Sequence, residues 1–90
     1  MGVYWHAFNK QQMGAMIVEN LSLDGCGIRI LTPHELKRGE VLRLEFKLDD
    51  ASEAFIRIRG QLRWVLYDLA GIEFHSSYSI MKILAAYIES

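Results

Sequence analysis

The sequence predicts a small all-β protein: an antiparallel barrel of about six short strands, followed by one C-terminal helix. Three observations predict this fold. Segments 41–48 and 56–64 alternate between apolar and polar residues, as half-buried strands do. Segment 80–88 instead repeats its apolar residues with the period of an α-helix. The length of 90 residues suits one domain with an economical core.

The N-terminal part predicts three short strands. The first, Val3 to Phe8, is rich in aromatic and branched residues, and the polar residues 9–12 turn the chain into the second, Ala15 to Glu19. Segment 20–25, Asn-Leu-Ser-Leu-Asp-Gly, has the composition of a turn. A third strand follows from Gly27 to Leu31.

The two alternating segments predict a hairpin. In segment 41–48 the even-numbered residues are apolar and three of the four odd-numbered ones are charged, so one face is buried. Residues 49–52 turn the chain into the second strand. The buried face of that strand is expected to hold Ile56, Ile58, Leu62 and Trp64. A last strand, 70–74, follows a turn near 67–69.

The C-terminal segment predicts an amphipathic helix, with Ser77 or Ser79 as its N-cap. Because an apolar stripe needs a sheet to cover, the helix is expected to plug or flank the barrel. The stripe consists of Ile80, Ile83, Leu84, Tyr87 and Ile88.

Composition and charge exclude several function classes. With a net charge of −1 there is no global positive field, so neither DNA nor RNA is expected as a partner. No apolar run approaches the roughly 20 residues of a membrane span and no leader is visible, so we expect no membrane insertion and a cytoplasmic protein. Cys26 has no second cysteine to pair with and is expected to be a small packed side chain.

No residue pattern indicates an enzyme or a metal site. Catalysis by a nucleophile needs a base and an orienting group nearby, and no such arrangement is visible, so no catalytic residue is assigned. His6, His34 and His75 lie on different predicted elements without paired spacing, which argues against a metal. No cofactor is expected.

Three motifs carry a resemblance to a known family. Asn20-Leu21-Ser22-Leu23-Asp24-Gly25 fits an (Asp/Asn)-x-Ser-x-x-Gly signature between strands. Gly60-Gln61-Leu62-Arg63-Trp64 and Ala70-Gly71-Ile72-Glu73-Phe74 fit Gly-x-(apolar)-x-Trp and Gly-(apolar)-x-Phe strands. The helix ends with Leu84-Ala85-Ala86-Tyr87-Ile88. In this order, from about Ala15 onward, the chain resembles the PilZ domain family.

The resemblance implies a six-stranded PilZ-type (split) β-barrel, with residues 1–90 as a single PilZ-like domain that is either complete or part of a longer protein. Many PilZ domains bind cyclic di-GMP, a bacterial second messenger. By that likeness Asn20, Ser22 and Gly25 are the ligand-binding residues. The implied function is a cyclic di-GMP-binding signalling module that regulates motility, pili or exopolysaccharide. The alternative is a degenerate adaptor that binds no nucleotide and acts through a protein partner.

The family's site also uses an Arg-x-x-x-Arg before the first strand, and this chain does not contain it there. The arginines lie in a region outside this sequence or are lost, and the sequence leaves both open. Arg59 to Arg63 matches the pattern literally but lies in a late strand, so the role is not transferred to it. Two missing phosphate contacts would weaken binding by roughly 10²- to 10⁴-fold. Weak or no binding is therefore expected of this chain.

Two further features have alternative interpretations. The turn residues 20–25 can bond their own backbone instead of a ligand. Arg57, Arg59 and Arg63 form either a phosphate-binding stripe or a solvated face balanced by acids such as Glu45 and Glu73, and we favour the second. The aromatic residues of the first strand are expected to pack in the core more than to form an interaction surface.

Overall fold

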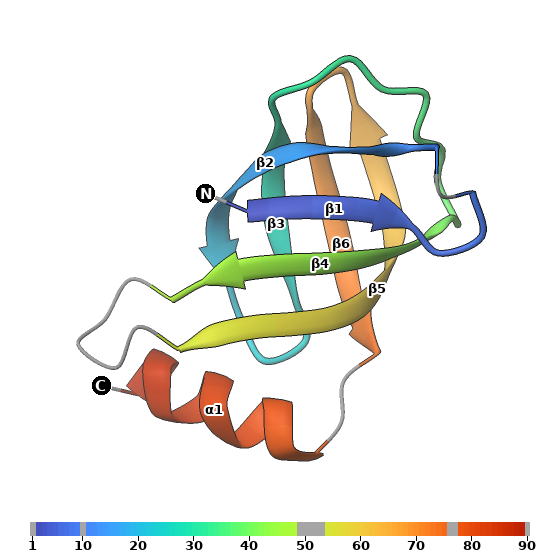
Figure 1. The fold of residues 1–90 in the computed structure, drawn as a ribbon. Helices are drawn as coiled ribbons and strands as arrows, with labels where there is room; N and C mark the ends of the chain where they lie inside the picture. Colours follow the sequence, from blue (N-terminus) through green and yellow to red (C-terminus); the bar gives the residue numbers. More distant parts are fainter. Residues whose placement is uncertain (1, 10, 49–53, 76–77, 90) are drawn as a thin grey trace.

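The computed structural model is a closed barrel of six antiparallel strands followed by one helix (Figure 1). It describes residues 2–9, 11–48, 54–75 and 78–89. The elements are β1 (Gly2–His6), β2 (Met13–Leu21), β3 (Gly25–Ile30), β4 (Val41–Lys47), β5 (Phe55–Leu66), β6 (Leu69–His75) and α1 (Tyr78–Glu89). The predicted fold class is confirmed, and each element ends within two residues of its predicted bounds. The predicted turn at 49–52 lies outside the described residues.

The strand order around the barrel is β1-β2-β3-β6-β5-β4, and β4 pairs with β1 to close it. Four of the six pairings join strands that follow one another in the chain, whereas β1–β4 and β3–β6 join strands that do not. Figure 1 shows β1 and β4 side by side, with β5 next to β4. Because every strand has a partner on both sides, no long edge is left to pair with another chain.

The barrel interior is apolar, because alternate residues of each strand point inward. Tyr4 of β1 and Met16 of β2 are fully buried there, and no polar or charged residue of the described chain is buried. The predicted inward faces of β4 and β5 are confirmed up to Leu62. Their buried members are Leu42, Leu44, Phe46, Ile56, Ile58 and Leu62.

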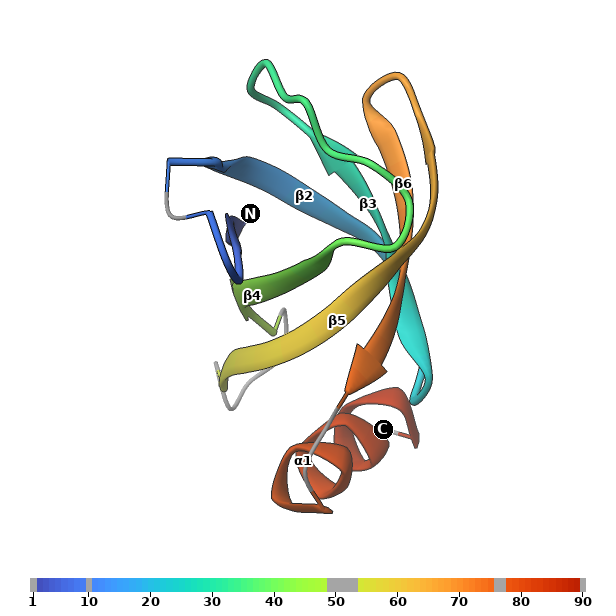
Figure 2. The same ribbon diagram turned by 90° about the vertical axis from the view of Figure 1, so that its right-hand side faces the viewer.

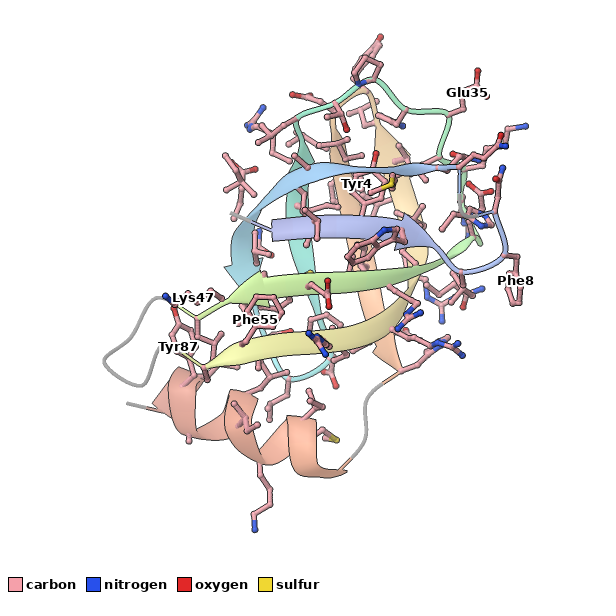
Figure 3. The ribbon with its side chains drawn as sticks, in the orientation of Figure 1. Tyr4, Phe8, Glu35, Lys47, Phe55 and Tyr87 are labelled. Carbon is pink, nitrogen blue, oxygen red and sulfur yellow. The ribbon has the colours of Figure 1, made fainter. Side chains whose placement is uncertain are left out.

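Two aromatic residues predicted for the core are exposed instead, and a third, Trp5, is only partly buried and faces outward beside Arg43. Trp64 is 49 % exposed because the β5–β6 register shifts between Leu62 and Trp64, which inserts Arg63 as an extra residue on β5. Such a bulge turns the following side chain to the face opposite to that predicted by strict alternation. Phe8 is 84 % exposed because β1 ends at His6, and its ring points away from the barrel, whereas Tyr4 lies within it (Figure 3).

Helix α1 lies across one end of the barrel (Figure 2). Leu84 is fully buried, and Ile80 and Tyr87 pack partly buried against the core. Ile83 and Ile88 are about 40 % exposed, so the buried stripe is narrower than predicted. The helix begins at Tyr78, before Ser79, and Ser77 lies outside the described residues.

No helix in the described residues has both the length and the apolar character needed to cross a membrane.

Candidate functional site

Ser22 organises the turn between β2 and β3. Its hydroxyl donates to the Gly25 carbonyl oxygen (3.2 Å) and accepts a hydrogen bond from the Asp24 N–H (3.3 Å). Its own N–H also donates to the Gly25 carbonyl (2.9 Å), and the Phe74 N–H donates to the Asp24 carbonyl (2.7 Å), which ties the turn to β6. Ser22 therefore bonds the backbone of its own turn, which is the alternative interpretation given above for residues 20–25.

Asn20 lies beside β3 at a bulge in β2. The β2–β3 register shifts between Val18 and Asn20, and the Gly27 N–H donates to Asn20 Oδ1 (2.8 Å). A Cβ on Gly27 would come within 2.7 Å of Asn20 Nδ2, so any residue other than glycine would displace this amide. The Nδ2 group of Asn20 donates to no group in the described part of the chain, and the side chain is exposed.

Gly25 allows β3 to approach β6 closely. A Cβ at this position would collide with the Ile72 carbonyl oxygen, and its φ is not positive. Of the two roles considered for Gly25, close approach is therefore the one that the fold requires. Because Gly25 has no side chain, the backbone of the turn lies directly against the backbone of β6.

The β5 bulge places an indole ring opposite Asn20. Trp64 pairs with Gly71 of β6, and a Cβ on Gly71 would collide with the indole, which lies over this glycine. Gly71 in turn pairs directly with Gly27 of β3. The two opposed glycines therefore make room for two side chains on the outer face of the sheet, with the Asn20 amide over Gly27 and the Trp64 indole over Gly71.

These residues line one hollow of about 360 Å³ on the outer face of β2, β3, β6 and β5, which we term the glycine-floored hollow. Asn20, Ser22 and Gly25, the three residues predicted as ligand-binding, all line it. Its other lining residues are Asp24, Cys26, Gly27, Arg63, Trp64, Gly71, Ile72 and Glu73.

The charges that line the glycine-floored hollow are one guanidinium and two carboxylates, those of Arg63, Asp24 and Glu73. Arg63 Nη2 donates to Glu73 Oε1 (2.6 Å). This hydrogen bond holds the pKa of Glu73 below its ordinary value and raises the pKa of Arg63. The pair is mutually satisfied, so the hollow offers no surplus positive charge to a phosphate.

Cys26 lines this hollow but is buried, as expected of a packed side chain. Burial raises the pKa of its thiol to about 12, because a thiolate would lose its hydration there. The thiol is therefore protonated at neutral pH and is a poor nucleophile.

Sequence reasoning did not assign Arg63, Trp64 and Gly71 to the site. Gly-x-(apolar)-x-Trp and Gly-(apolar)-x-Phe contain both Trp64 and Gly71, but strict alternation placed the indole in the core. The signal that could have placed the Trp64 indole on the surface is the glycine on the next strand, Gly71, which leaves room for a large ring. The literal Arg59-to-Arg63 match does not form a pair at this site, because Arg59 lines a different hollow.

The solvated-face interpretation of the arginine stripe holds for two of its three members. Arg57 Nε donates to Glu45 Oε1 (2.7 Å), and Arg63 pairs with Glu73, as expected across neighbouring strands. Arg59 has no such acidic partner among the described residues.

None of the three histidines lines the glycine-floored hollow. His6 Nε2 lies 2.7 Å from Glu40 Oε2, and His34 Nε2 lies 2.6 Å from the Tyr67 carbonyl oxygen. In the described segments no group of three or more His, Cys, Asp or Glu side chains has a geometry suited to a metal.

The chain matches a known protein family. The family model described as PilZ domain matches residues 4–90, which is nearly the whole chain. Neither the curated proteins nor the solved structures contain a match to the chain.

Proposed function

The chain belongs to the PilZ domain family, and from this membership we propose that its glycine-floored hollow receives a guanine base of cyclic di-GMP. PilZ domains generally serve as cyclic di-GMP receptor modules in signalling, and they act as binding or adaptor modules rather than as enzymes. In our proposal residues 1–90 form a single such domain. The domain acts in the cytoplasm, where it controls motility, pili or exopolysaccharide.

The observation that carries this proposal is the pair of opposed glycines between Asn20 and Trp64. A planar base needs a ring to stack on and a polar edge. Gly27 and Gly71 leave room for the Asn20 amide and the Trp64 indole, and the indole supplies the stacking surface. Base–aromatic stacking contributes roughly 1 to 3 kcal/mol per base.

The polar groups around the hollow complement the edge of guanine. The Nδ2 group of Asn20 has two N–H donors for the O6 and N7 acceptors of guanine. Ser22 Oγ keeps one lone pair after bonding its own turn, and the Asp24 carboxylate lines the same hollow, so guanine N–H groups find acceptors there. Gly25 contributes by holding the turn against β6.

The phosphates of cyclic di-GMP need positive charge, and the glycine-floored hollow has none to spare. Two carboxylates and one arginine line it, and that arginine is engaged by Glu73. We therefore assign the phosphates to an Arg-x-x-x-Arg segment that precedes β1 in the signalling form of the protein. Binding would order this segment against the barrel, which is a common way for a ligand to produce a signal.

An NMR titration of the chain with cyclic di-GMP tests the base subsite. We expect shifts of the Gly25, Gly27 and Gly71 amides and of the Trp64 indole N–H, even where binding is weak. Asn20→Ala should reduce these shifts, whereas Gln11→Ala, an exposed change outside the hollow, should not. Shifts confined to other strands would contradict the proposed subsite.

The second candidate function is a PilZ adaptor that binds no nucleotide and docks on a protein partner. The excess of carboxylates at the hollow and the engagement of the Ser22 hydroxyl in its own turn favour it. A form that carries Arg-x-x-x-Arg before β1 and still gives no binding heat with cyclic di-GMP would establish this alternative.

A further inference from the structure

Two arginines face each other on the outside of the barrel, away from the glycine-floored hollow. Arg43 of β4 pairs in register with Arg59 of β5, and both are exposed because their neighbours along each strand are buried. Like charges directly opposite on neighbouring strands destabilise a sheet. The row continues with Trp5 of β1 beside Arg43 and His75 of β6 beside Arg59, so it contains no acidic residue.

The acids of the adjacent rows are engaged by other arginines. Glu45 accepts from Arg57 (2.7 Å), and Glu73 accepts from Arg63 (2.6 Å). Within the segments that the structure describes, neither Arg43 nor Arg59 forms an ion pair or a side-chain hydrogen bond. Their two charges are therefore uncompensated by the protein, and a bound anion would neutralise both.

These arginines line a second hollow, of about 260 Å³, which we term the arginine hollow. Its charged lining consists of three arginines and Glu45, a surplus of two positive charges. Trp5, which is partly buried, also lines it. The remaining lining residues are Leu44 and Ile58. The hollow lies over β1, β4 and β5, which stand side by side in Figure 1.

We propose that the arginine hollow is a binding site for a small phosphomonoester that carries an aromatic ring, such as a nucleoside monophosphate. Arginine forks match phosphate oxygens, and a phosphomonoester dianion neutralises two guanidinium groups at once, which one carboxylate does not. Trp5 supplies a flat surface for the ring beside the two arginines. The site shares no lining residue with the glycine-floored hollow and does not depend on the function proposed for it.

The two tryptophans of the chain allow the sites to be followed separately, because Trp5 lines one hollow and Trp64 the other. The full chain is titrated with inorganic phosphate and with adenosine monophosphate while both indole N–H resonances are recorded. We expect a saturable shift of the Trp5 resonance. The dissociation constant should lie in the millimolar range or below, which is roughly the affinity that two charge-assisted contacts give. Stacking should make adenosine monophosphate bind roughly 5- to 100-fold more tightly than phosphate.

Charge-matched variants show whether the two arginines are responsible. Arg43→Gln and Arg59→Gln should each weaken binding by roughly tenfold or more. Arg38→Gln removes the same charge from an exposed loop residue outside both hollows and should leave the affinity nearly unchanged. Amide spectra of each variant confirm that the barrel is intact.

Three results would overturn the proposal. The first is the lack of any saturable Trp5 shift with either probe at low salt. The second is equal weakening by Arg38→Gln, which would mean that only the general field of the protein attracts the anion. The third is a glutamate-rich peptide that shifts Trp5 where phosphate and adenosine monophosphate do not, because the face would then be a protein-docking surface.

Discussion

Gly27 of β3 lies directly opposite Gly71 of β6, and each glycine leaves room for a large side chain from the neighbouring strand. Asn20 occupies the space over Gly27, and Trp64 occupies the space over Gly71. The absence of two Cβ atoms therefore positions both the amide and the indole of the candidate site.

Replacing Gly71 tests this arrangement. Gly71→Ala should displace the Trp64 indole, since the added Cβ and the ring cannot share the space, and should destabilise the barrel by about 1 to 3 kcal/mol, as overpacking does. The Trp64 indole resonance and the denaturant midpoint measure the two effects. Gly39→Ala is the control, because Gly39 has a φ of 92° but open space around it, so this change strains the backbone without crowding a neighbouring side chain. An unmoved indole in Gly71→Ala would contradict the arrangement.

The helix is attached to the barrel mainly through Leu84. Leu84→Ala should lower the free energy of unfolding by about 2 to 5 kcal/mol, because the side chain is fully buried. Ile83→Ala, in the same helix and 39 % exposed, should cost much less. Denaturant titrations of both variants check this, and equal losses would show that the helix packs differently.

The fold was predictable in its elements and less so in its pairings. Alternation located β4 and β5, and the change of period located α1, because side-chain direction in regular structure follows a fixed repeat. The two bulges, at Glu19 and Arg63, insert one residue each and reverse the face of everything that follows, so strict alternation assigned Trp64 to the core. The β3–β6 pairing joins segments far apart in the chain, and no local pattern reports it.

The candidate site was predictable only in part, because local patterns report residues that are adjacent in the chain and not those brought together by distant strands. Asn20, Ser22 and Gly25 are adjacent in the chain and form a recognisable turn, and they do line one hollow. Trp64 and Arg63 reach that hollow only through the β5 bulge and the β3–β6 pairing. Most of the residues that sequence reasoning missed are therefore contributed by the distant strands β5 and β6.

The ion pair of Arg63 with Glu73 should give a small dependence of stability on pH. The pKa of Glu73 in the folded protein lies below its ordinary value of 4.5, first through the hydrogen bond from Arg63. A lowered carboxyl pKa stabilises the fold above the unfolded value, and this contribution is lost as the pH falls through the folded value. The stabilities of the wild type and of Glu73→Gln should therefore differ at pH 6 and converge once the pH has fallen below the lowered pKa of Glu73 in the folded protein. Because both side chains are exposed, the difference should shrink with salt, and a difference that persists at low pH would refute this assignment.

The opposed arginines should cost stability in the absence of an anion. Arg43→Glu replaces a like-charge pair with an opposite-charge pair across the β4–β5 ladder and should stabilise the barrel by roughly 0.2 to 1 kcal/mol at low salt. Arg43→Lys keeps the charge and should change stability little. Thermal unfolding at low and high salt measures the effect, and destabilisation by Arg43→Glu would show that the two guanidinium groups do not repel each other.

The measurement that tests the central claim most directly is a calorimetric titration of two forms with cyclic di-GMP: this chain, and the chain preceded by an Arg-x-x-x-Arg segment. The chain alone should bind weakly or not at all, because carboxylates outnumber arginines at the glycine-floored hollow. The arginine-containing form should bind roughly 10²- to 10⁴-fold more tightly, and Asn20→Ala or Ser22→Ala in that form should remove much of the gain. Tight binding by the chain alone, or affinity in the longer form that is unchanged by both substitutions, would contradict the assignment of guanine to this hollow.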